Sequence, residues 1–310
     1  MRLFSSNCLK IRILTFLAGV CTILTLISCK QKGNEKAAAY LVVTDSYNRD
    51  VVLPNKPQRI ISVSPGITEI LYLLQADSLV VGVSDFCDYP PQVIEKERVG
   101  GMQNLKIERL LQLQPDLVLV GSIISREFTQ KVESAGIPIV VLNEEKGMEG
   151  VKNTIRFIAR ILEKDSLAEQ IVKKYESRLK LIKDETLSQE KSVYYVVGFG
   201  AGGDFSAHGN SYIHEIITLA GGKNICSKLK NWSVNREYLF QQDPDFIFIR
   251  NEDLETFCKT YPYNLLTAVK ENRVFPIESG WIDIVSPRNL DAINYIHQKL
   301  VEADSLEMFP

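Results

Sequence analysis

Histidine is scarce in this chain of 310 residues, which has only three, at positions 208, 214 and 297. A zinc or manganese site would need several histidines or carboxylates that converge, so we expect no metal site in the protein itself. Basic residues are not in excess either, since the formal net charge is −2. Without a positive field to attract a phosphate backbone, we expect no nucleic-acid partner.

The usual motifs of nucleophilic and nucleotide chemistry are also missing. The sequence has neither a G-x-S-x-G elbow nor a P-loop. Residues 198–203 match G-x-G-x-x-G literally, but a dinucleotide fingerprint must open a helix, and residues 204–210 are typical of a loop. We therefore expect no enzymatic activity and no cofactor, and we interpret the glycines as a loop beside a ligand cleft.

The first 28 residues have the form of an export signal. Arg2, Lys10 and Arg12 precede an apolar run over residues 13–27, and no acidic residue occurs among them. The run ends in Ser28-Cys29, which resembles the bacterial lipobox, where the cysteine is acylated. An ordinary signal peptide or an uncleaved anchor is the alternative. We expect loss of residues 1–28, lipidation of Cys29, a polar tether over residues 29–40, and an exported protein anchored to a membrane.

Three of the six cysteines remain once the signal is removed and Cys29 is acylated. Cys87, Cys226 and Cys258 are odd in number and have no C-x-x-C spacing, so at most one disulfide can form. We expect free thiols, most of them buried.

Short apolar runs alternate with amphipathic stretches in the mature chain. Runs without polar alternation are typical of parallel strands covered by helices on both faces. The pattern predicts one α/β lobe over residues 41–146 and a second over residues 190–306, and a cleft between two lobes is the default ligand site. The predicted strands are 59–64, 79–83, 116–120, 137–142, 193–197, 246–249 and 274–277; the predicted helices are 66–74, 107–113, 211–220, 234–241, 263–271 and 287–302.

A charged helical segment, residues 147–189, separates the two predicted lobes. Apolar residues recur at helical spacing before and after residues 164–166, where the pattern breaks. Ser166 is a candidate N-cap at that break. The two apolar faces are Ile155, Ile158, Ala159 and Leu162, followed by Ile171, Tyr175, Leu179 and Ile182.

Several aromatic residues fall in predicted loops, whereas core aromatics usually lie within helices or strands. Each of them could pack internally, but together they favour a large, flat or partly apolar ligand. His208, in the glycine-rich loop, is a polar loop residue, a ligand contact or a haem ligand. The aromatic residues are Phe86, Tyr89, Phe205, Trp232 and Trp281.

Glu108 and Glu237 occupy equivalent places, each at the start of a predicted helix in its own lobe. Stabilisation of the helix dipole is one explanation. A pair of exposed anionic contacts for a two-fold symmetric partner that carries arginines is the other.

An ordered set of short segments runs through almost all of the mature chain. By these segments the chain resembles the substrate-binding proteins of ABC importers for cobalamin, ferric siderophores and haem, and within that family the cobalamin-binding proteins are most similar. The segments are 59–65 with Thr68-Glu69, 81–84 with Asp88-Tyr89-Pro90, 107–110, 114–118, 235–237 and 286–288.

The resemblance implies a class III periplasmic binding protein: two Rossmann-like lobes joined by a long rigid backbone helix. It implies that Glu108 and Glu237 dock to an ABC permease dimer with its ATPase subunits, and that the protein is a monomer. The resemblance also places ligand contacts at Phe86, Phe205 and Trp232 and in the loop before Ser286. That loop keeps the tryptophan of the cobalamin-binding proteins, as Trp281, but lacks the Asp and Arg residues that flank it in those proteins. With the residues above, the expected ligand contacts are Phe86, Tyr89, Met102, Phe205, His208, Trp232, Gly280, Trp281, Ile282, Asp283 and Ile284.

The expected ligand is a metal chelate. Cobalamin or a related corrinoid is the first choice, because the motif loops supply few basic side chains for an anionic chelate. A ferric siderophore or haem, taken up for iron, is the alternative.

Overall fold

The computed structural model describes residues 39–101, 104–143, 147–185 and 187–308. The chain divides into Met1–Tyr40 and Leu41–Pro310, and every helix and strand below belongs to the second unit. The predicted signal peptide, Cys29 and Met102 lie outside the described residues.

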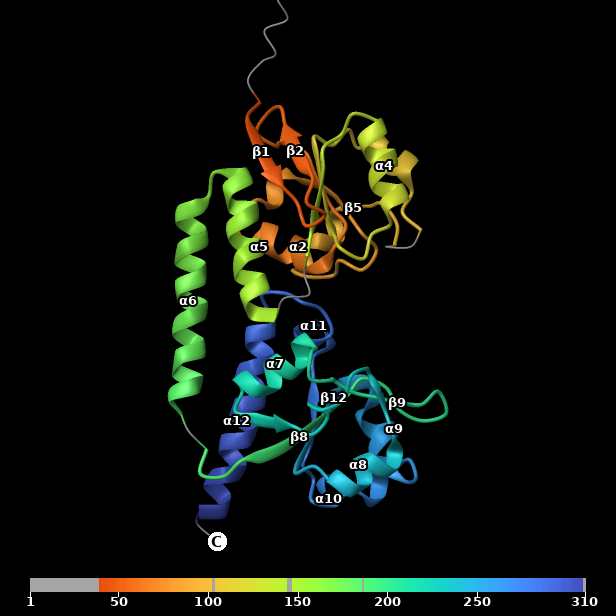
Figure 1. Cartoon of the computed structure of the whole chain (residues 1–310), viewed down its shortest axis with the longest axis vertical. Coiled ribbons are helices and arrows are strands. Elements are labelled where there is room, and N and C mark those ends of the chain that lie inside the picture. The colour runs from red at the N-terminus through yellow and green to blue at the C-terminus, as the bar shows by residue number, and fades with distance from the viewer. Residues whose placement is uncertain (1–38, 102–103, 144–146, 186, 309–310) are drawn as a thin grey trace, which may run out of the picture. The chain divides into compact units, whose positions relative to one another are not determined.

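The first lobe is built on a parallel sheet of five strands in the order β5-β4-β3-β6-β7 (Figure 1). Its central strands are apolar and fully buried, which is why the runs read from the sequence form a parallel sheet rather than a half-exposed one. The strands are β3 (Ile60–Ser62), β4 (Val80–Val83), β5 (Glu97–Arg98), β6 (Leu117–Gly121) and β7 (Ile139–Leu142). The helices are α2 (Pro65–Leu73), α3 (Ile107–Gln112) and α4 (Arg126–Ser134), with 3-10 turns at Asp77–Leu79 and Pro91–Glu95.

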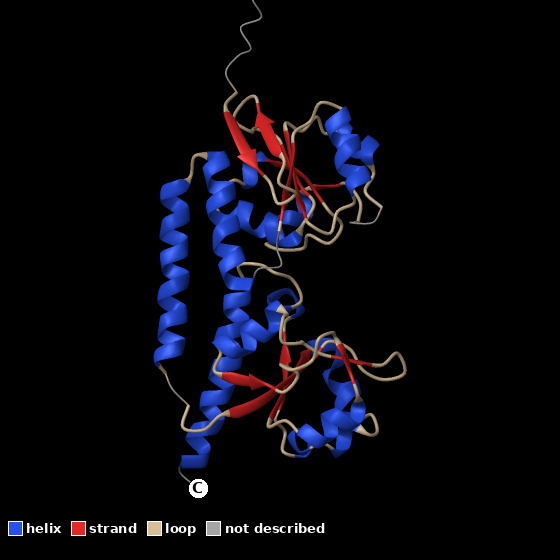
Figure 2. Ribbon diagram, in the orientation of Figure 1, coloured by secondary structure: helices blue, strands red, loops and turns tan. Residues whose placement is uncertain are grey.

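The second lobe repeats this arrangement with four parallel strands in the order β10-β8-β12-β13. Figure 2 shows that in both lobes helices pack around the strands. The expected α/β class with parallel sheets is confirmed. The strands are β8 (Lys191–Val196), β10 (Gly222–Asn224), β12 (Phe246–Arg250) and β13 (Val274–Ile277), and β9 (Asp204–Phe205) pairs separately with β11 (Ser233–Val234). The helices are α7 (Tyr212–Leu219), α8 (Arg236–Gln242), α9 (Leu254–Lys259), α10 (Thr267–Lys270), α11 (Ser279–Ile282) and α12 (Asn289–Met308), with 3-10 turns at Asn251–Asp253 and Tyr263–Leu265.

Two helices, α5 (Gly147–Leu162) and α6 (Asp165–Asp184), come between the two sheets in sequence and lie side by side along one side of both lobes, at the left in Figure 1. Helix α5 packs against α2 of the first lobe and α7 of the second. The link is therefore a helix pair rather than one helix. The expected N-cap at Ser166 is wrong, because α6 begins at Asp165 after Lys164, which makes no side-chain cap. No helix in the described ranges has both the length and the apolar character needed to cross a membrane.

Gly147, where α5 begins, has a positive φ of 59°. A Cβ there would lie 1.5 Å from Oε2 of Glu215, which accepts a hydrogen bond from the Met148 N–H at 3.3 Å. Gly147→Ala would destabilise the fold in two ways. A non-glycine residue is strained in the left-handed conformation, and the hydrogen bond from the Met148 N–H to Glu215 at the helix start would be lost.

We expect Gly147→Ala to lower the free energy of unfolding by about 2–3 kcal/mol in urea titrations. Gly136→Ala is the matched control, because Gly136 also has a positive φ but an added Cβ meets no atom within 4 Å. If the two variants lost equal stability, the contact with Glu215 would contribute nothing.

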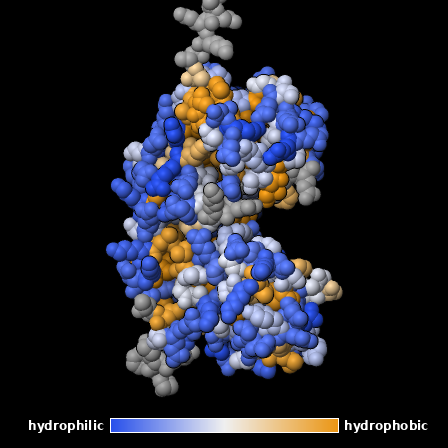
Figure 3. All heavy atoms as spheres, in the orientation of Figure 1, coloured by the Kyte–Doolittle hydropathy of each residue, from blue (hydrophilic) through white to orange (hydrophobic). Residues whose placement is uncertain are grey.

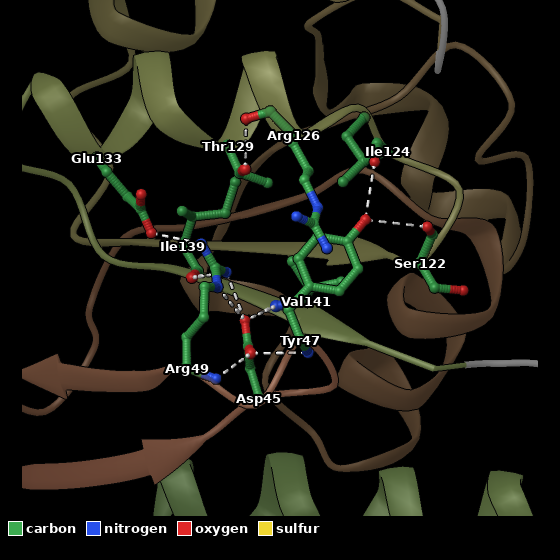
Figure 4. Close-up of polar contacts among 10 residues, drawn as sticks. All are labelled: Asp45, Tyr47, Arg49, Ser122, Ile124, Arg126, Thr129, Glu133, Ile139 and Val141. Carbon is green, nitrogen blue, oxygen red and sulfur yellow. Dashed lines mark hydrogen bonds and ion pairs between the residues drawn. The ribbon is translucent and has the colours of Figure 1, made fainter.

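A hairpin of β1 (Leu41–Thr44) and β2 (Asp50–Leu53) precedes the first lobe's sheet, with Val43 opposite Val51. The carboxylate of Asp45 closes its turn by accepting the N–H groups of Tyr47 (2.9 Å) and Arg49 (3.1 Å) and the Arg49 Nε (3.0 Å) (Figure 4). The Tyr47 hydroxyl donates a bifurcated hydrogen bond to the carbonyl oxygens of Ser122 (3.2 Å) and Ile124 (3.0 Å). The hairpin therefore holds the segment that follows β6.

Asp45→Asn should lower the free energy of unfolding by about 2–3 kcal/mol at neutral pH, since these bonds are charge-assisted and buried. Burial raises the pKa of Asp45, but the Arg49 side chain and the backbone N–H groups outweigh it and hold the pKa below its usual range. The contribution is therefore complete above about pH 4 and is lost as the pH falls through the folded pKa. Urea titrations between pH 7 and pH 3 should show the variant's deficit shrinking, whereas exposed Asp50→Asn should change little at any pH; equal losses would contradict this.

Candidate functional site

A hollow of about 700 Å³ lies where the carboxyl ends of the strands in both lobes meet. In the first lobe the strand order reverses between β3 and β6, and ligands of open α/β sheets bind outside the carboxyl ends at such a point. The surface is indented between the two lobes (Figure 3). The lining residues are 64–66, Phe86, Asp88, Ser122 and Ile123 from the first lobe, and His208, 210–212, Trp232, Ser279, Gly280 and 283–285 from the second.

Phe86 forms the aromatic wall of the first lobe, and its side chain is 57% exposed. The Arg98 guanidinium holds the backbone on either side of it, donating to the carbonyl oxygens of Ser84 (2.8 Å) and Cys87 (2.6 Å). The ring packs on Gly101, where an added Cβ would lie 3.2 Å from the ring. This exposed ring is therefore positioned before any ligand arrives.

Trp232 and His208 form the facing wall, with ring centroids 5.0 Å apart in an edge-to-face pair. The backbone of Trp232 is tied to β9 through the Ser206 N–H, which donates to its carbonyl at 2.8 Å. The Nδ1 of His208 accepts the Asn210 N–H at 3.2 Å. The neutral ring therefore carries its proton on Nε2.

The segment from Ser279 to Val285 supplies the third wall. Its carboxylate, Asp283, accepts hydrogen bonds from the Tyr195 hydroxyl (2.7 Å) and the Arg250 Nε (2.5 Å). The positive charge of Arg250 therefore compensates the negative charge of Asp283. Burial, and then Asp283 itself, raise the pKa of Tyr195, so the hydroxyl remains a donor. Asn289, at the start of α12, donates to the carbonyl oxygens of Trp281 and Ile284, both at 2.8 Å.

The lining is aromatic and polar, with little net charge available to a ligand. Asp88 and Asp283 are its only carboxylates among the described residues, and no lysine or arginine of the described chain lines it. Helices α2 and α7 both begin at the hollow, so the partial positive charge of each amino end faces it. The arrangement suits a large neutral ligand with hydrogen-bonding groups at its edge.

The structure brings six of the eleven expected ligand contacts to this hollow: Phe86, His208, Trp232, Gly280, Asp283 and Ile284. Four others lie elsewhere, and Met102 is outside the described residues. Ile282 is fully buried, and Trp281 packs on Tyr295 at 6.1 Å, because the turn of α11 directs both inward. Phe205 packs on Gly203, and the ring of Tyr89 lies under Arg288 at a second hollow.

Sequence reasoning missed the small and polar contacts of the hollow. Ser64, Pro65 and Gly66 follow β3, Ser122 and Ile123 follow β6, and Ser211 caps α7. Their signal was their place at or just after the end of a predicted strand, or at the start of a predicted helix.

Glu108 and Glu237 are both exposed, each in the first turn of its helix, α3 or α8. Neither forms an ion pair with another described residue, so both carboxylates are available to a partner. Asn235 caps α8 through the Glu237 N–H at 2.7 Å.

Cys87, Cys226 and Cys258 are free thiols, as expected, with Cys87 and Cys226 buried and Cys258 partly so. Burial raises the pKa of Cys226 to about 11 and also raises the pKa of Cys87 and Cys258, which favours the protonated thiol in each. The G-x-G-x-x-G stretch forms a loop, as expected. In the part of the chain that the structure describes, no three His, Cys, Asp or Glu residues form a metal-binding group.

A family model described as periplasmic binding protein matches residues 60–279, which include both sheets and the link between them. The chain belongs to the periplasmic binding protein family. The predicted family and the role of a transport-type substrate-binding protein are thereby confirmed.

Named relatives of this binding protein agree with the family. It is 27% identical over 280 residues to the uncharacterized ABC transporter substrate-binding lipoprotein YvrC of Bacillus subtilis, covering 87% of this chain and 88% of that one. It is 28% identical over 253 residues to a vitamin B12-binding protein of Vibrio campbellii, covering 80% and 91%. Among solved structures, the periplasmic heme-binding protein HutB of Vibrio cholerae shares the fold, with a TM-score of 0.72, 20% identity, and coverage of 78% of this chain and 98% of that one.

Proposed function

We propose that the protein is the lipid-anchored substrate-binding protein of an ABC importer and captures cobalamin, or a related corrinoid, in the hollow between its lobes. The observation that carries the ligand choice is the lining: aromatic and polar side chains, with no lysine or arginine among the described residues. The relative named as a vitamin B12-binding protein supports the same choice.

A corrinoid suits this lining because it offers broad apolar faces and a rim of amide groups. Phe86 and Trp232, on opposite lobes, provide apolar surface for the faces. The serines and the backbone groups at the starts of α2 and α7 provide hydrogen-bonding partners for the rim.

Haem or a ferric siderophore is the alternative ligand. Haem carries two carboxylates, and many ferric siderophores are anionic, so both would gain from lysine or arginine side chains, which the described lining lacks. Ligation of haem iron by the Nε2 of His208 would also require the proton to move to Nδ1. That would break the hydrogen bond from the Asn210 N–H.

Anchoring and docking complete the proposal. Cys29 would hold the protein to a membrane through its acyl chains, in keeping with the lipoprotein named among its relatives. Glu108 and Glu237 would contact arginines of the two permease subunits, and hydrolysis of ATP would take place in separate subunits. The binding protein itself makes and breaks no bond.

Calorimetric titration of the chain from residue 30, which keeps the whole body Leu41–Pro310, tests the ligand choice. We expect tight one-to-one binding of cyanocobalamin and weaker binding of haemin and of ferric siderophores. Heat from an iron chelate with none from cyanocobalamin would overturn the corrinoid assignment and move the protein to iron uptake.

A further inference from the structure

Arg288 connects the two lobes through a buried ion pair. It precedes α12 in the second lobe, and its guanidinium donates to Oε1 of Glu69, in α2 of the first lobe, from Nε at 3.0 Å and Nη2 at 2.6 Å. The side chains are 14% and 3% exposed. The guanidinium also lies 4.0 Å from the ring centroid of Tyr89, a cation–π contact.

The other side of the same guanidinium packs on the wall of the inter-lobe hollow. A Cβ built on Gly280 would lie 2.5 Å from Nη1 of Arg288 and 2.8 Å from Nη2. Gly280 lines the inter-lobe hollow, whereas Glu69, Tyr89 and Arg288 line a second hollow of about 610 Å³. Arg288 thus lies between Gly280 of the inter-lobe hollow and the second hollow. Any side chain at position 280 would collide with the guanidinium in its present place.

This ion pair is poorly explained as a device for stability alone. The desolvation penalty of two buried charges offsets most of their Coulombic attraction. In addition, Oε2 of Glu69 has no hydrogen-bond partner among the described residues. Burial raises the pKa of Glu69 despite the neighbouring arginine. What the pair does provide is a fixed place for the guanidinium, since Nε and Nη2 both donate to Oε1 of Glu69 while Tyr89 covers one face of the guanidinium.

We propose that Arg288, fixed by Glu69 and Tyr89, is a positioning residue for the Ser279–Val285 wall of the inter-lobe hollow. Ligand affinity then depends on an ion pair that lies outside that hollow, and a contact from the first lobe sets the shape of a wall in the second. The inference rests on the proposed function, because it takes this hollow as the ligand site.

The first test compares cyanocobalamin affinities by calorimetry. Glu69→Gln/Arg288→Met removes both charges together and so leaves no buried charge unpaired. We expect the dissociation constant to rise at least tenfold. Arg178→Met is the matched control, because Arg178 also lines the second hollow and pairs with Asp291 at 3.5 Å; its dissociation constant should stay within twofold of wild type. An unchanged affinity in the double variant, or an equal loss in the control, would overturn the proposal.

Glu69→Gln alone is the milder variant if the double variant does not fold. Its amide oxygen can still accept from Arg288, so we expect a loss of affinity of a few-fold. The Arg288 charge is then uncompensated, so the melting temperature should also fall, and affinity is measured well below it. Gly280→Ala adds a second check. It should weaken binding in the wild-type background and have little further effect without Arg288. The same effect in both backgrounds would contradict a route through Arg288.

Hydrogen exchange without ligand separates this inference from the ligand assignment. Amides of Ser279–Val285 should exchange faster in Glu69→Gln/Arg288→Met than in wild type, and Arg178→Met should leave them unchanged. If wild type binds no cyanocobalamin but this difference appears, the proposed ligand fails and the positioning role stands. If no difference appears, the positioning role fails whatever the ligand.

Discussion

Charge reversal at both proposed docking glutamates, Glu108→Lys with Glu237→Lys, should abolish cyanocobalamin uptake and leave ligand affinity within about twofold of wild type. Both carboxylates are exposed, lie outside the lining of the inter-lobe hollow and have no ion-pair partner among the described residues. Their loss costs the protein only the helix-dipole contribution, about 0.3–1 kcal/mol each. At the proposed contacts with two permease arginines, however, each substitution would replace an attraction by a repulsion.

Uptake into proteoliposomes that contain the permease and its ATPase subunits measures this effect, alongside stimulation of ATP hydrolysis. Glu127→Lys with Glu255→Lys is the matched control, because each of these residues is also an exposed glutamate in the first turn of a helix, one per lobe. Normal uptake by the Glu108/Glu237 variant, or a large fall in its ligand affinity, would refute the docking role.

The second large effect is expected at the aromatic walls. Phe86→Ala and Trp232→Ala should each weaken cyanocobalamin binding by about 1–3 kcal/mol, roughly 5- to 150-fold, because each removes an apolar surface that the ligand would cover. The two residues lie on opposite lobes, so their effects should be close to additive.

Phe205→Ala is the control for this prediction. Phe205 and Trp232 belong to the same lobe and are 36% and 37% exposed, but only Trp232 lines the inter-lobe hollow. Calorimetry should find Phe205→Ala close to wild type. An equal loss of affinity from Phe205→Ala would move the ligand away from the hollow, and no loss from either wall variant would leave the hollow without a ligand.

The parallel sheets could be predicted because their strands are buried on both faces. Runs such as residues 117–120 and 246–249 are apolar throughout, and only strands of that kind show no alternation. The β1–β2 hairpin escaped prediction because its apolar positions alternate over only four residues per strand, with Val42 and Val52 exposed. The turn of that hairpin depends on Asp45 and Arg49, and their contacts with β7 span about 90 residues of sequence.

Of the residues expected to contact a ligand, two exposed loop aromatics line the hollow, whereas two that a short helix turns inward do not. Phe86 and Trp232 fall into the first class. Trp281 and Ile282 fall into the second, because the single turn of α11 leaves no periodicity in the sequence and directs both residues to the core. Arg288 could not be assigned to Glu69, since the pair is separated by 219 positions and only the fold brings it together.

Fluorescence of a single tryptophan tests the central claim, that a corrinoid binds between the lobes, most directly. The chain has two tryptophans; Trp232 lines the inter-lobe hollow and Trp281 packs on Tyr295. In Trp281→Phe, cyanocobalamin should quench the remaining emission with one-to-one saturation, because the corrin absorbs where tryptophan emits. In Trp232→Phe, the quenching at saturation should be clearly smaller. Absence of saturable quenching in Trp281→Phe would contradict the claim.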